Sequence, residues 1–464
     1  MPLVICARPM VSSPAEARRT GKPIVYIQAN IHAGEVEGKE AELAILRRVC
    51  QDKAGLLDKL ILLADPIYNI DGNEKFGPQA RNRPEQNGPE LVGLRASGEG
   101  FDLNRDGIKA ESLEFRAVLA NIWNTWDPDV MMDLHTTDGT RHGYDLTYSP
   151  PMNPNTPPGI VRFSRDEMLP KIRQQIRKES GIELFDYGDA TMRNKVQSWT
   201  TFGEGGRYMT NYAGLRNRIG ILSEAATYIP FKDRIDATDR FVMAVLHYVA
   251  KNSARVIDLT RGSDQQMAAA SSNPTSLPEW GVRFEMAPRG EEETILERPY
   301  KTGEVRPTGR PTELIKVKMP IFDRFVATKK SRLPVAYSID SREKSIVELL
   351  RRQGIVVERI VKPYKTEGDS FLIGNVKVDS QPFQGHRLIQ LDGKFMSSPI
   401  ELAAESYVVR TSQPLSALIF TMLEPESSDG VTTWGFLKSE PKAGDTFPIR
   451  KIYLPIRAIT ERMP

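Results

Sequence analysis

The chain has 464 residues, of which 40% are hydrophobic and 27% are charged. This length exceeds that of a usual single hydrophobic core and predicts two domains, while the composition is ordinary for a soluble globular protein. A net charge of +3 on so long a chain gives no support for binding to nucleic acid or to an anionic membrane.

Cysteine content and hydropathy exclude further classes of protein. Cys6 and Cys50 are the two cysteines, so a disulfide framework is excluded, and the sequence does not decide whether they form one bridge. No window approaches 18 consecutive apolar residues, so no transmembrane segment is expected. The start of the chain lacks a basic segment followed by a long apolar stretch, so no signal peptide is visible. Localisation is not predicted, and export to the periplasm or the exterior stays open if the native N-terminus is longer.

Buried strands and amphipathic helices alternate along the first half of the chain. Short apolar runs rich in β-branched residues predict buried strands at 24–31, 60–67, 129–134 and 219–223. Helical patterns follow at 36–50, 111–126, 166–180 and 234–257. Residues 76–100 show no period, and a loop of that length inside a compact domain is usually functional. Residues 190–217 are expected to be mostly irregular.

This order of elements predicts an α/β domain over residues 1–260, built on a mixed, mostly parallel sheet with helices on both faces. Residues 261–277 are rich in Ser, Gln, Ala, Asn and Pro, which is typical of a linker. Shorter alternating segments with turns follow. They predict a mainly β C-terminal domain over residues 278–464, with one strand-helix-strand unit near residues 335–361.

Polar side chains stand at the carboxyl ends of three predicted strands. His32 and Glu35 follow the first strand with Gly34 between them, His135 ends the third, and Glu224 ends the fourth. Because the carboxyl ends of parallel strands share one edge of a sheet, these residues are expected to converge. Any one of them could be a solvated strand-end residue, but chance placement of the whole set is hard to credit.

The chemistry of this set points to a metal hydrolase. Two histidines and one glutamate leave a fourth tetrahedral position for water, which is the mark of a catalytic zinc site. A further carboxylate near that water can take its proton and pass it to a leaving amine. Glu224 lies in the apolar context I-L-S-E-A-A, where burial raises the pKa of a carboxyl group. Arg83 and Arg105 add positive charge that suits a substrate with a terminal carboxylate.

These motifs resemble the zinc carboxypeptidase family of the carboxypeptidase A type. His-Ala-Gly-Glu at 32–35, Asp-Leu-Asn-Arg at 102–105, His135 and Glu224 fall in the order and spacing of that family, over residues 24–228. The resemblance implies one Zn²⁺ per chain, held by His32, Glu35 and His135. It also implies that Glu224 is the general base and proton shuttle.

The resemblance implies further roles for polar residues around the metal. Asn104 and Arg105 would grip the terminal carboxylate of the substrate, and Arg83 would polarise the scissile carbonyl and stabilise the oxyanion. Asp102 would orient His32, as the partners of ligating histidines generally do. A substrate-binding tyrosine is expected upstream of Glu224, and the spacing leaves two candidates, Tyr208 and Tyr212.

The predicted function is therefore that of a zinc-dependent metallocarboxypeptidase acting on peptides or proteins with a free C-terminus. One alternative is a zinc amidase or deacylase of the same fold that acts on a non-peptide amide. The other is a zinc-free binding protein with the C-terminal β region as its working part. The sequence predicts neither the oligomeric state, nor the residue cleaved, nor the role of the C-terminal region.

Overall fold

The computed structural model describes residues 1–53, 55–139, 142–298 and 313–463. A seven-stranded sheet with the strand order β1-β3-β2-β6-β11-β7-β8 forms the centre of the N-terminal region. Its strands are β1 Val4–Cys6, β2 Ile24–Ala29, β3 Ile61–Asp65, β6 Val130–Thr136, β7 Leu146–Ser149, β8 Leu184–Asp186 and β11 Ile219–Ala225. Neighbouring strands are parallel except at β1–β3 and β11–β7, which confirms the predicted mixed, mostly parallel sheet.

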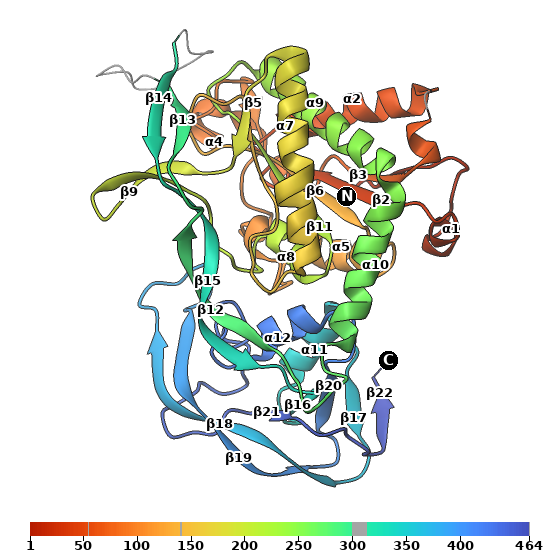
Figure 1. Cartoon of the computed structure of the whole chain (residues 1–464), viewed down its shortest axis with the longest axis vertical. Helices are drawn as coiled ribbons and strands as arrows, with labels where there is room; N and C mark the ends of the chain where they lie inside the picture. The colour runs from red at the N-terminus through yellow and green to blue at the C-terminus, as the bar shows by residue number, and fades with distance from the viewer. Residues whose placement is uncertain (54, 140–141, 299–312, 464) are drawn as a thin grey trace.

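The central strands are buried on both faces, which explains their nearly continuous apolar runs. In β2, Val25 and Ile27 face one hydrophobic cluster, while Ile24 and Tyr26 face the other. The first cluster includes side chains of α2 Glu37–Gln51, α7 Leu169–Ser180 and α9 Phe231–Lys251. The second includes α5 Leu113–Val118 and α8 Met209–Leu215 and continues into the C-terminal region. In Figure 1, α7 and α9 lie in front of β6 and β11.

Short elements occupy the connections of the N-terminal region. They are α1 Pro14–Arg19, α3 Ile70–Glu74, β4 Gly77–Pro78, α4 Gln79–Asn82, β5 Leu91–Val92, α6 Pro158–Val161, 3₁₀ turns at Leu56–Asp58 and Leu103–Arg105, and π-helical segments at Leu119–Trp123 and Arg162–Met168. The long loop predicted at 76–100 thus contains only brief structure. The described part of the chain contains no helix with the length and apolar character needed to cross a bilayer.

The C-terminal region is rich in β structure, as predicted. Its elements are β12 Glu279–Pro288, β13 Glu293–Glu297, β14 Ile315–Met319, β15 Ile321–Arg332, β16 Ala336–Ile339, α11 Lys344–Arg352, β17 Glu358–Ile360, β18 Tyr364–Val378, β19 Ile389–Leu402, β20 Tyr407–Arg410, α12 Ser416–Leu423, β21 Ile449–Ile452 and β22 Thr460–Arg462. A second seven-stranded sheet has the order β19-β18-β21-β16-β20-β17-β22. Figure 1 places it below the first sheet.

Contacts cross the predicted boundary near residue 260. The segment predicted as a linker begins inside α10 Ser253–Ala269, which leads from one region to the other in Figure 1 and buries Val256 and Met267. Strands β9 Asp189–Arg193 and β10 Val196–Thr200 form where mostly irregular chain was expected. They pair with each other as a local hairpin, and β10 also pairs with β15, so β9, β10, β12 and β15 form one four-stranded sheet. The division into domains stays a prediction.

Candidate active site

The residues predicted at the strand ends come together at one edge of the central sheet. His32 and Glu35 lie in the turn between β2 and α2, and His135 belongs to β6. Glu224, in β11, pairs in register with His135. At Gly38, a Cβ atom would lie 2.8 Å from the Leu134 side chain, so the start of α2 approaches β6 more closely than a larger residue permits.

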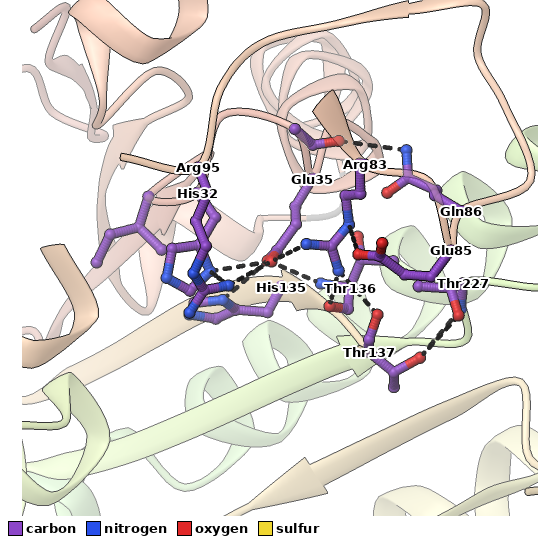
Figure 2. A network of polar contacts seen from close by, with 12 residues as sticks. His32, Glu35, Arg83, Glu85, Gln86, Arg95, His135, Thr136, Thr137 and Thr227 are labelled. Atoms are coloured by element: carbon purple, nitrogen blue, oxygen red, sulfur yellow. Dashed lines mark hydrogen bonds and ion pairs between the residues drawn. The ribbon is translucent and has the colours of Figure 1, made fainter. Parts of the chain in front are cut away.

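Two histidines and one glutamate form a compact set of potential metal ligands. One ligand atom each from His32, Glu35 and His135 lies within 4.8 Å of the others, and all three residues are buried. Nδ1 of His32 is 2.9 Å from Glu35 Oε1, and Nδ1 of His135 is 3.0 Å from Glu35 Oε2. Figure 2 shows the contacts of the Glu35 carboxylate with both imidazole rings as dashed lines.

A carboxylate contacts each histidine ring at Nε2, the nitrogen that faces away from Glu35. Nε2 of His32 lies 3.0 Å from Asp102 Oδ1, and Nε2 of His135 lies 2.9 Å from Asp133 Oδ2. When the ring proton of each histidine is on Nε2 and points at the carboxylate, each Nδ1 keeps a free lone pair. That lone pair is directed at the space between the three potential metal ligands. This donor set suits Zn²⁺. Asp133 was missed in the sequence, although it precedes His135 by two residues on one strand and so shares its face.

Two arginines neutralise the negative charge at this centre. The Arg83 guanidinium is 2.8 Å from Glu35 Oε1 and also donates to the carbonyl oxygens of Thr136 and Thr137. Burial raises the pKa of Glu35, but Arg83 and the two histidines outweigh it and hold that pKa well below its usual range. Arg95 lies 3.2 Å from His32 Nδ1 (Figure 2). The sequence did not predict Arg95 as a site residue, because residues 76–100 show no periodic pattern that would place it.

A cavity of about 150 Å³ opens onto these groups. The predicted residues that line it are His32, Glu35, Arg83, Asn104, Arg105, His135, Tyr208 and Glu224. Arg95, Tyr187 and Phe202 also line it, and the sequence did not predict them. The Arg105 guanidinium lies over the Tyr208 ring at 4.6 Å from the ring centre, and Asn104 Oδ1 accepts a hydrogen bond from the Met209 amide at 3.1 Å.

Glu224 faces the cavity with a carboxylate that is suited to proton transfer. Burial raises the pKa of Glu224 to about 8, and the charge of Glu35 adds to this effect, while His135 and Arg83 oppose it. Its Oε2 atom has no hydrogen-bond partner among the described residues. A carboxyl group with a pKa near neutrality can both accept and release a proton.

Comparisons with known proteins bear on the region that carries the potential metal ligands. Residues 9–155 match the model of the family described as zinc carboxypeptidase. This region is therefore similar to the zinc carboxypeptidase family. The resemblance read from the motifs is thus confirmed, as is the enzyme class, a metallocarboxypeptidase. Glu224 lies beyond the matched residues.

Curated relatives cover most of the chain. Carboxypeptidase 2 of Trichophyton equinum is 22% identical over 445 residues, which are 92% of this chain and 76% of that protein. Carboxypeptidase 2 of Trichophyton rubrum is 22% identical over 463 residues, with 95% and 78% covered.

Solved structures of metallo-carboxypeptidases match part of this chain. The enzyme from Pseudomonas aeruginosa, in complex with (2-guanidinoethylmercapto)succinic acid, has 16% identity and a TM-score of 0.39, covering 53% of this chain and 60% of that one. The enzyme from Burkholderia cenocepacia has 14% identity and a TM-score of 0.38, covering 54% and 61%. The chain therefore spans about 60% of the length of these structures.

The two candidate tyrosines lie in different environments. Tyr208 lines the cavity against Arg105. Tyr212 is fully buried in the hydrophobic core, and its hydroxyl group donates to Gln353. Tyr212 is not among the residues that line the cavity, so its position does not support the substrate role predicted for it. Sequence spacing could not separate the two residues: Tyr208 is the extended residue before α8, whereas Tyr212 lies within the helix.

Proposed function

We propose that the protein is a zinc-dependent carboxypeptidase that hydrolyses the C-terminal peptide bond of peptides or proteins. The observation that carries this proposal is the position of Asn104 and Arg105. They line the same small cavity as the three potential metal ligands and Glu224. A group that recognises a carboxylate beside hydrolytic machinery is what cleavage at a free chain end requires.

His32, Glu35 and His135 would hold one Zn²⁺ per chain. When bound, zinc supplies a Lewis acid that polarises a carbonyl group and lowers the pKa of water. Asp102 and Asp133 keep the two imidazole rings in the orientation that directs each Nδ1 to the centre. The same donor set is consistent with the zinc dependence of the family.

Glu224 would transfer the proton during hydrolysis. Its unpartnered Oε2 takes a proton from the attacking water and then delivers it to the departing nitrogen. Arg83 would donate to the substrate carbonyl oxygen as negative charge develops there, which stabilises the transition state more than the ground state. Arg83 now contacts Glu35, so its guanidinium is already held at the centre.

Arg105 and Asn104 would bind the terminal carboxylate of the substrate. The alternative for Arg105 was a surface ion pair with its neighbour Asp106, but Asp106 is fully buried. The Asp106 carboxylate accepts hydrogen bonds from the Glu111 and Ser112 amides instead. The Arg105 guanidinium rests on Tyr208, which limits its motion and presents its fork to the cavity.

Amidation of the substrate C-terminus is therefore expected to weaken cleavage. Removing the carboxylate leaves the Arg105 donors poorly paired, a loss of about 1–3 kcal/mol, or roughly 5- to 150-fold in kcat/KM. Arg105→Ala should abolish the preference for free over amidated ends while zinc stays bound. The measurement is kcat/KM for one peptide in both forms with both proteins, together with metal analysis.

Arg105→Lys is the matched control, because it keeps the positive charge and loses the two-pronged geometry. It should retain part of the preference. Equal cleavage of free and amidated peptides by the unmutated enzyme would reject a carboxypeptidase and favour the amidase or deacylase. A dialysed protein without stoichiometric zinc would instead favour the zinc-free binding protein.

A further inference from the structure

The proposed substrate-binding residues lie on a segment that the C-terminal region contacts at several points. This segment, residues 101–111, carries Asp102, Asn104 and Arg105. We propose that Gln384 and Gln353 of the C-terminal region are positioning residues for the carboxylate-binding pair. The inference rests on the proposed function, and it assigns a task to the C-terminal region that the sequence left open.

Gln384 lies at the tip of the hairpin formed by β18 and β19. The amide of Phe383 donates to the His386 carbonyl oxygen at 2.7 Å, and the reverse bond measures 3.0 Å, so the two residues between them form a tight turn. Gln384 has a φ of 51° and Gly385 a φ of 80°, as the favoured two-residue hairpin turn requires. This left-handed conformation is uncommon for glutamine, so the surrounding contacts must maintain it.

The hairpin tip contacts both ends of the 101–111 segment. Gln384 Oε1 accepts a hydrogen bond from the Asp102 amide at 3.0 Å. His386 Nε2 lies 2.9 Å from a carboxylate oxygen of Glu111. The Asp102 carboxylate in turn accepts from the Asn104 amide at 3.0 Å, so the backbone at Asp102 sets the start of the turn that presents Asn104 and Arg105.

Gln353 contacts the backbone that follows Asn104 and Arg105. It is fully buried at the C-terminal end of α11, and its Nε2 donates to the carbonyl oxygens of Gly107 and Ile108, each at 3.0 Å. A Cβ atom at Gly107 would lie 2.4 Å from the Gly206 carbonyl oxygen, so this backbone has little room to move. Gln353 also accepts from the hydroxyl group of Tyr212 on α8.

Together these contacts restrain the backbone before and after the carboxylate-binding residues. A guanidinium fork selects a carboxylate only when its two donors stay in the correct plane, so restraint of the backbone improves binding. The restraining groups come from residues 282 and 246 positions away in the chain. The C-terminal region thereby completes the substrate site of the N-terminal region.

Gln384→Asn tests this role without disturbing the turn. Asparagine favours the left-handed conformation, so the hairpin keeps its shape while the side chain becomes one carbon shorter and loses the Asp102 amide. KM for a peptide with a free C-terminus should rise about five- to ten-fold, with kcat within about two-fold and zinc unchanged. Gln381→Asn, on the exposed part of the same hairpin end, is the matched control and should leave KM unchanged.

If Gln384 has a purely structural role, Gln384→Asn should lower the thermal midpoint, or it should lower kcat through a smaller active fraction, while KM stays constant. An unchanged KM with either of these losses would overturn the inference. Affinity of the same peptide for metal-replete Glu224→Gln protein, with and without Gln384→Asn, gives a readout without turnover. It should weaken by the same factor, and equal affinities would also overturn the inference. Failure of the proposed function is distinct, because it appears as equal cleavage of free and amidated peptides by the unmutated protein.

Discussion

Replacing Glu224 by Gln is expected to lower kcat by about 10²–10⁴-fold, the usual contribution of a general acid-base group. The amide keeps the shape of the carboxylate but cannot accept the proton. Glu224 is not among the three potential metal ligands, so zinc should remain at one per chain. The side chain lies in β11 between well-packed neighbours, and the near-isosteric change should leave the fold intact.

The measurement combines steady-state kinetics with metal analysis of the purified protein. Glu224→Asp keeps the base and shortens its reach, so its activity should fall between those of the other two proteins. Glu179→Gln, at an exposed site on α7, provides a control for the chemical change itself. Turnover near that of the unmutated enzyme in zinc-replete Glu224→Gln protein would remove Glu224 from the mechanism.

Replacing His135 by Ala is expected to remove zinc together with activity. Loss of a residue that merely orients a ligand costs roughly 10- to 100-fold in metal affinity, and loss of a ligand should cost more. The change also leaves Glu35 with one imidazole neighbour instead of two, and it deprives Asp133 of its contact with the ring. Competition with a chelator of known affinity would measure the effect.

His247→Ala is the control for this substitution. His247 is an exposed histidine on α9, so its removal should leave zinc content and activity unchanged. A circular dichroism spectrum and thermal midpoint for His135→Ala would separate loss of metal from loss of fold. One zinc per chain in folded His135→Ala protein would show that the third ligand has been misassigned.

Local sequence identified the central strands β2, β3, β6 and β11 and the positions of their strand-end residues, but not β7 or β8. Apolar runs such as 24–31 and 129–134 are long enough to identify buried strands, because both faces of each strand are covered. Once the strands are parallel, His32, His135 and Glu224 must emerge at the same edge. The spacing of these residues therefore carried most of the information about the chemistry.

Tertiary structure alone decided the features that depend on distant partners. Tyr208 and Tyr212 are separated only by the packing of α8, and Arg95 joins the site from a loop without a pattern. Pairing of β10 with β15 adds the local β9–β10 hairpin to a sheet of the C-terminal region. The contact of Gln384 with Asp102 joins residues 282 positions apart. Nothing in either local sequence specifies such a pairing, since it arises only when two separately formed elements pack together.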